Sequence, residues 1–117
     1  MFTFARILSL TALMMFISTA QAVSFNCQKA KTFIEKAICQ NPELSDLDDE
    51  LGSLYQLALT DNKNPAVFKK QQLGWLKQRD TCQTVDCVKK SYKQRIATLN
   101  KYNNNPDNFK PDMGGDY

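Results

Sequence analysis

The spacing of four cysteines is the sequence feature that most restricts the fold of this chain. The cysteines stand at positions 27, 39, 82 and 87, and the chain has no histidine. An even number of cysteines in a small exported domain indicates disulfide bonds. Structural zinc is the competing interpretation, but the two spacings are longer than those of zinc-binding Cys pairs, and there is no histidine to complete a site. We therefore expect two disulfides, no metal ion and no other cofactor.

Four cysteines can pair in three ways. We favour Cys27–Cys39 and Cys82–Cys87, because each bridge would close a short loop beside a predicted helix. The chain entropy removed on closing these loops corresponds to about 2 kcal/mol for the shorter and about 3 kcal/mol for the longer. Crossed pairings such as Cys39–Cys82 would close larger loops and stabilise the domain more. Energy alone therefore leaves the alternatives open, and local geometry is the argument for our choice.

Residues 1–22 have the pattern of a signal peptide. Arg6 precedes an apolar run at 7–17 that is too short to span a bilayer, and Ala20-Gln21-Ala22 is typical of a cleavage site. An ordinary N-terminal helix is the alternative. No cysteine directly follows the apolar run. We therefore expect a periplasmic or secreted protein that keeps no membrane anchor after cleavage, with its folded domain at 23–102.

Hydrophobic periodicity predicts an all-α domain, a small bundle of one short and three longer helices stapled by the disulfides. Polar residues 103–117 contain two Pro and two Gly, and we expect them to be disordered. The helices are expected at 33–40, 45–60, 65–80 and 85–102.

Local signals set the predicted helix ends. Thr32 and Glu35 form a capping box at the start of the first helix. Asn41-Pro42 is interpreted as the end of that helix, which leaves Ser45 as the N-cap of the second. Asn64-Pro65 supplies the N-cap and the first position of the third helix.

Several motif residues beside the predicted core are assigned to structure. Trp75 and Arg79 share one helical face, while Tyr92 and Arg95 share another. A partly buried Arg normally needs a carboxylate. A structural ion pair that fixes helix packing is the main interpretation, and a partner-binding role is the alternative. The candidate carboxylates are Glu35, Asp48 and Asp80.

Charge is unevenly distributed along the chain. Residues 43–61 carry six acids and no base, whereas residues 66–101 carry nine Lys or Arg against two Asp. Attraction between solvated helices is sufficient to explain this pattern. The acids also form a candidate partner surface, which comprises Glu43, Asp46, Asp49 and Glu50. A patch for an anionic envelope polymer would comprise Lys69, Lys70, Lys77, Lys89, Lys90 and Lys93.

The residue types argue against catalysis. Without histidine, the commonest general base is missing, and no Ser or Cys has a His partner. The carboxylates of residues 46–50 could suggest a glycosidase pair or a calcium site, but on one continuous helix they point in different directions. We therefore expect no enzyme. The net charge of +3 is small and the aromatic residues are predicted to be buried, so we expect no nucleic-acid partner.

Two stretches of the chain carry closely spaced motif residues. The first is Phe25-Asn26-Cys27-x-Lys29-Ala30-x-Thr32-x-x-Glu35-Lys36-x-Ile38-Cys39-x-x-Pro42-x-Leu44-x-x-Leu47-Asp48, and the second includes Gln72-x-x-Trp75-Leu76-x-x-Arg79-Asp80-x-Cys82, Cys87 and Tyr92-x-x-Arg95-Ile96-x-x-Leu99. Together they resemble the family of lysozyme-inhibitor LprI-like domains. The family usually has Asp where this chain has Asn26. The resemblance implies a small helical exported domain with paired cysteines.

Three functions are compatible with these sequence features. The first is an exported protein-binding module that inhibits a lysozyme, which the family resemblance implies. The second is a module that binds an anionic envelope polymer through its lysines, with an affinity that must weaken steeply with salt. The third is a structural partner of another envelope protein.

Overall fold

The computed structural model describes residues 25–104, which contain four α-helices. A short 3-10 turn, η1 (Cys27–Lys29), leads into α1 (Phe33–Gln40), α2 (Pro42–Asp61), α3 (Pro65–Arg79) and α4 (Val85–Asn104). No strand occurs within this range, so the predicted all-α bundle of one short and three longer helices is confirmed. The predicted signal peptide and the chain beyond residue 104 lie outside the described residues.

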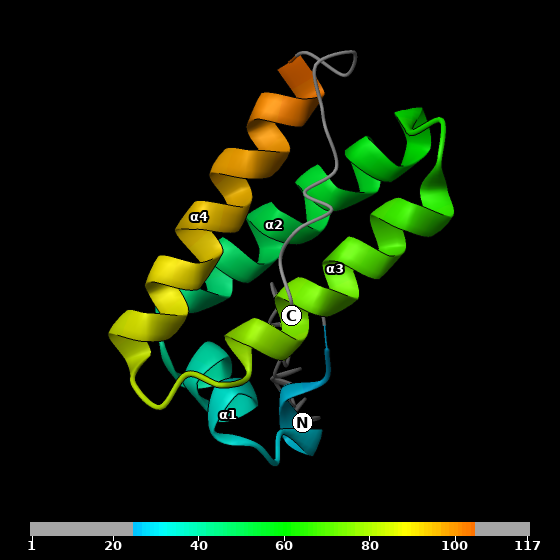
Figure 1. The fold of residues 1–117 in the computed structure, drawn as a ribbon. Coiled ribbons are helices and arrows are strands. Elements are labelled where there is room, and N and C mark those ends of the chain that lie inside the picture. The colour runs from blue at the N-terminus through cyan, green and yellow to red at the C-terminus, as the bar shows by residue number, and fades with distance from the viewer. Residues whose placement is uncertain (1–24, 105–117) are drawn as a thin grey trace, which may run out of the picture.

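The three long helices form an up-down-up bundle (Figure 1). Helices α2 and α4 run side by side in the same direction, and α3 runs opposite to both. Helix α1 lies across the end of the bundle where α3 turns into α4. The described part of the chain has no helix that is both long and apolar enough to cross a membrane.

The start of α1 follows its sequence signal. The Thr32 Oγ1 accepts a hydrogen bond from the Glu35 amide at 3.1 Å, and the Glu35 carboxylate accepts one from the Thr32 amide at 3.2 Å. This is the predicted capping box, and it satisfies amides that the helix itself leaves unpaired. The predicted start of α3 is also confirmed, with Asn64 as N-cap and Pro65 at the first helical position.

The predicted start of the second helix was wrong. Helix α2 begins at Pro42, with the Asn41 Oδ1 accepting from the Leu44 amide at 3.2 Å. Asn41 and Pro42 end one helix and begin the next, because Pro at the first position lacks only an amide that would be unpaired anyway. Ser45 is therefore not the N-cap. Its hydroxyl donates to the Ile38 carbonyl at 2.6 Å and ties α1 to α2.

Helix α4 is two residues longer than predicted. Tyr102 is buried against Phe68, with ring centroids 5.5 Å apart, and the Asn103 amide donates to the Leu54 carbonyl at 3.3 Å. These contacts between helices keep residues 103 and 104 helical, so the predicted disordered tail begins too early. Residues 105–117 of that tail lie outside the described range.

The core runs along the inner faces of all four helices, and both favoured disulfides form at the end of the bundle where α1 and the α3–α4 turn lie. Cys27 bonds to Cys39 and Cys82 to Cys87, with Cα–Cα distances of 5.7 and 5.6 Å. The first bridge fastens η1 to α1, and the second closes the α3–α4 turn. The buried apolar residues are Ile34, Ala37, Ile38, Leu44, Leu51, Ala58, Phe68, Trp75, Cys82, Val88, Tyr92, Ile96, Leu99 and Tyr102.

Replacing Gly52 with Ala should stabilise the protein. Gly52 lies inside α2, and a Cβ added there would meet no atom within 4 Å. Gly is about 1 kcal/mol less favourable than Ala inside a helix, so we expect Gly52→Ala to raise the free energy of unfolding by about that amount. Urea unfolding followed by circular dichroism measures the change. An unchanged or lower free energy would show that α2 is distorted at this position.

Candidate functional site

A chain of hydrogen bonds through Tyr92 connects the three long helices. Arg79 on α3 donates from Nη1 to the Tyr92 hydroxyl on α4 at 3.0 Å. That hydroxyl donates to Oδ1 of Asp48 on α2 at 2.7 Å. Asp48 is 3% exposed and Tyr92 is fully buried. A buried carboxylate needs such donors, so this chain of bonds fixes how the helices sit against one another.

Arg79 lies between aromatic rings and a surface carboxylate. Its guanidinium carbon is 5.5 Å from the centroid of the Trp75 ring and 5.9 Å from that of Tyr92. Its Nε and Nη2 both donate to Oδ1 of Asp80, at 2.9 and 2.7 Å. Trp75 meets Tyr92 edge to face at 5.2 Å. The guanidinium therefore gains cation–π contacts on one side and an ion pair on the other.

The predicted carboxylate partners of Arg79 take three different positions. Asp80 pairs with it directly, and Asp48 is reached through Tyr92. Glu35 acts in the α1 capping box. Hydrogen bonds from the Lys31 and Thr32 amides lower its pKa below the ordinary value, and the positive charge of Arg79 adds to that shift.

Arg95 forms a separate buried contact between α3 and α4. Its Nε donates to Oε1 of Gln72 at 3.0 Å, and its guanidinium carbon lies 5.9 Å from the centroid of the Phe68 ring. Both polar residues are buried. Arg95 is therefore part of the packing between these helices. The sequence analysis expected a carboxylate as its partner and did not identify Gln72.

The phenol of Tyr92 is held in its neutral form. Burial raises the pKa of Tyr92 well above its usual value, and the Asp48 carboxylate raises it further, while the positive charge of Arg79 opposes the shift. A neutral phenol can accept from Arg79 and donate to Asp48 at the same time. Burial also raises the pKa of Tyr55, to a degree that Arg95 reduces.

The four acids predicted as a partner surface do not form one unit. The carboxylate of Glu43 bridges to α4, with its oxygens 2.6 Å from Lys89 Nζ and 3.0 Å from Lys93 Nζ. Hydrogen bonds from these two lysines lower the pKa of Glu43 below its ordinary value. Glu43 is still exposed, like Asp46, Asp49 and Glu50, but its carboxylate is engaged by these lysines. The available acidic surface is therefore smaller than predicted and begins after Glu43.

One exposed leucine lies among the charged residues of α2 and another among those of α3. The sequence analysis did not identify either of them. Leu57 is 53% exposed and Leu73 is 60% exposed. The spacing of each from its charged neighbours could have revealed them, because residues four and seven apart share a helical face. We define the α2 outer face as Asp46, Asp49, Glu50, Ser53, Leu57 and Asp61, and the α3 outer face as Ala66, Lys69, Lys70, Leu73 and Lys77, all of which are exposed.

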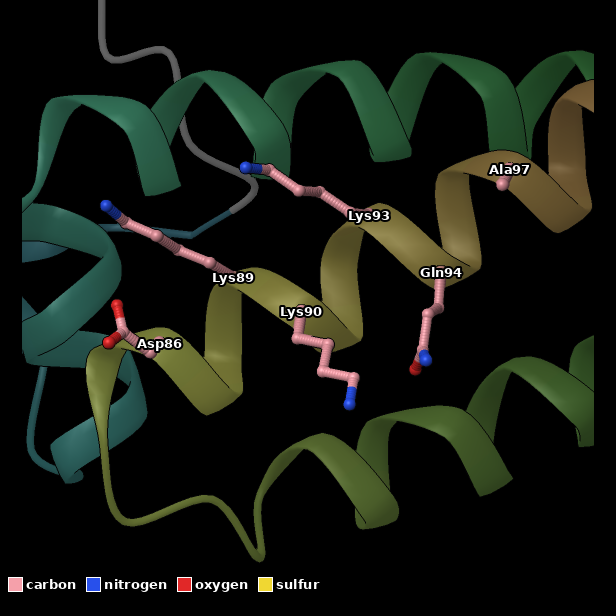
Figure 2. Close-up of a pocket in the computed structure, with 6 residues that line it drawn as sticks. All are labelled: Asp86, Lys89, Lys90, Lys93, Gln94 and Ala97. Carbon is pink, nitrogen blue, oxygen red and sulfur yellow. The ribbon is translucent and has the colours of Figure 1, made fainter.

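The six lysines proposed for a polyanion site are divided among different surroundings. Lys69, Lys70 and Lys77 belong to the α3 outer face. On α4, a shallow hollow is lined by Asp86, Lys89, Lys90, Lys93, Gln94 and Ala97 (Figure 2). Its lysines diverge: Lys89 and Lys93 extend toward α2, where they meet Glu43, whereas Lys90 extends to the α3 side.

The chemistry of the central network is that of a scaffold. Asp48 and Tyr92 are buried, and Arg79 is only 13% exposed in its side chain. Within residues 25–104, no group of three His, Cys, Asp or Glu lies close enough together to hold a metal ion. The accessible functional groups therefore lie outside this network, on the α2 and α3 outer faces and along the α4 hollow.

The sequence profile of the family described as "Lysozyme inhibitor LprI" matches residues 26–99. This range includes both disulfides, the central network and all four helices except the last five residues of α4. The chain belongs to the LprI family.

Known LprI proteins agree with this assignment. The proteins named "Lipoprotein LprI" of Mycobacterium tuberculosis and Mycobacterium bovis are each 32% identical to the chain over 80 residues, which is 65% of the chain. The match spans 40% of the length of these mycobacterial relatives. No solved structure gives a significant match.

Ionisation of Tyr92 provides a test of the network. Unfolded Tyr92 should ionise near pH 10, whereas the folded residue has a raised pKa, so its contribution to stability is present below about pH 10 and is lost as the pH rises above it. We expect tyrosinate absorbance in the folded protein up to about pH 11 to be the same for wild type and Tyr92→Phe. Alkaline loss of stability should be smaller in the variant.

The unfolded proteins are the control for this titration. In denaturant, wild type should titrate with four tyrosines and the variant with three, since all phenols are then exposed. If the folded wild type shows one more titrating tyrosine than Tyr92→Phe below about pH 11, the Tyr92 phenol is accessible and the network is not buried in solution.

Proposed function

We propose that this protein is an exported, non-enzymatic binding module that inhibits a lysozyme through the α2 outer face. Membership of the LprI family supports the inhibitor role, and the name of the mycobacterial relatives as lipoproteins supports a location in the cell envelope, periplasmic or secreted. The observation that carries the proposal is the exposure of Asp46, Asp49 and Glu50 on one side of α2.

Charge complementarity is the physical basis of the proposal. Many lysozymes are basic and bind a polysaccharide in a surface cleft. Three exposed carboxylates within two turns of one helix would attract such a surface, with the main effect on the association rate and on the choice of partner. Leu57, two to three turns further along the same face, would add apolar contact area. Because contacts with α4 hold α2 in place, little ordering entropy opposes binding.

The direct test is a cell-wall lysis assay with the purified, disulfide-bonded protein. We expect inhibition of at least one of the c-type, g-type and i-type lysozymes at micromolar concentration. The triple variant Asp46→Asn, Asp49→Asn, Glu50→Gln should lower the association rate constant about tenfold at low salt, because it removes the charges that steer the encounter. Absence of inhibition of all three lysozyme types would refute the proposed function.

A matched triple variant separates a local effect from a change of net charge. Asp107→Asn, Asp112→Asn, Asp116→Asn removes the same number of acids from another part of the sequence. We expect this variant to inhibit like wild type. If it weakens association as much as the α2 variant does, net charge controls the encounter and the α2 outer face is not the docking surface. Circular dichroism of both variants is the control for correct folding.

A further inference from the structure

The α2 and α3 outer faces carry opposite charges around a similar apolar centre. On α2, Asp46, Glu50, Ser53, Leu57 and Asp61 follow one another at spacings of three and four residues, so they form a continuous stripe. Leu57 is its one large apolar side chain and is more than half exposed. The stripe carries three negative charges and no positive charge.

The α3 outer face repeats this arrangement with the opposite sign. Ala66, Lys70, Leu73 and Lys77 follow the same spacings of three and four residues, and Lys69 flanks them. Leu73 is 60% exposed, the highest value among the large hydrophobic residues of the described chain. Two exposed leucines, one inside a negative stripe and one inside a positive stripe, are thus presented by the same molecule.

We propose that the α2 outer face of one molecule docks against the α3 outer face of a second copy. If the two helices pack antiparallel with Leu57 against Leu73, Asp61 comes opposite Lys69. In the same register, Lys77 comes opposite Ser53, within one turn of Glu50. The leucines then cover one another from water while opposite charges meet on both sides of them.

A second copy fits better than an unrelated partner because both halves of the contact are on this chain. A basic partner would use the α2 outer face alone, and an acidic partner would use the α3 outer face alone. Each copy offers both faces, so reciprocal docking would close a two-fold dimer with two equivalent contacts. The dimer would cover Glu50 and Leu57, so it would compete with any partner that uses the α2 outer face. The association itself does not depend on the proposed inhibition of lysozyme.

Sedimentation velocity of the full disulfide-bonded protein tests self-association without any partner. We expect a concentration-dependent dimer at low ionic strength, with a dissociation constant that rises about tenfold when salt is raised toward molar concentration, because screening weakens the exposed charge pairs. Leu73→Ser should weaken the dimer at every salt concentration, because it removes the apolar contact. A protein that stays monomeric at millimolar concentration and low salt would overturn the proposal.

Charge reversal identifies the faces. The variant Asp46→Lys, Glu50→Lys, Asp61→Lys has two positive faces, and the variant Lys70→Glu, Lys77→Glu has two negative faces, so each alone should be monomeric. An equimolar mixture of the two variants should associate again, because every contact then joins opposite charges. Association of either variant alone, or failure of the mixture to associate, would overturn the assignment of these faces.

A variant with the same charge change elsewhere completes the test. Lys36→Glu, Lys101→Glu alters two exposed lysines on α1 and α4. We expect it to dimerise like wild type. If it is as monomeric as Lys70→Glu, Lys77→Glu, the effect follows net charge and the α3 outer face has no specific role.

Discussion

The packing of the long helices depends on the buried carboxylate of Asp48 and its hydrogen bond from Tyr92. An ionised carboxylate inside a small domain is strongly unfavourable unless donors and a positive charge compensate it. Tyr92 supplies the donor at 2.7 Å, and Arg79 donates to Tyr92 from α3. Because each of the three groups comes from a different helix, the network ties α2, α3 and α4 to one another.

Other contacts of the bundle are arranged around this network. Trp75 packs against Tyr92 in an edge-to-face contact, and its Nε1 donates to the Ser91 carbonyl at 3.4 Å. Glu43, between one and two turns before Asp48 on α2, pairs with Lys89 and Lys93, which stand on either side of Tyr92 in the sequence of α4. These exposed ion pairs contribute little stability by themselves, but they repeat the same register between α2 and α4. The disulfide in the α3–α4 turn limits how far Arg79 can move from Tyr92.

Much of the fold could be predicted because its signals are local. The capping box at Thr32, the Asn64-Pro65 helix start and the short loops between paired cysteines each involve residues within twelve positions of one another. The start of α2 was missed because Asn41-Pro42 is equally compatible with ending a helix and beginning one. The ion pairs between Glu43 and the α4 lysines could not be predicted, because they depend on α2 and α4 lying side by side.

The family motif and the accessible surface are different parts of this molecule. Trp75, Arg79 and Tyr92 match the family signature and are mostly buried, so they explain why the chain keeps this fold. Partner recognition is proposed instead for the solvent side of α2 and α3. The most direct test of this account is a double-mutant cycle of Asp48→Asn and Tyr92→Phe, measured by urea unfolding. The account predicts a coupling of about 0.5–3 kcal/mol, the range for residues in one buried network. A coupling near zero would show that the two side chains act independently and would contradict it.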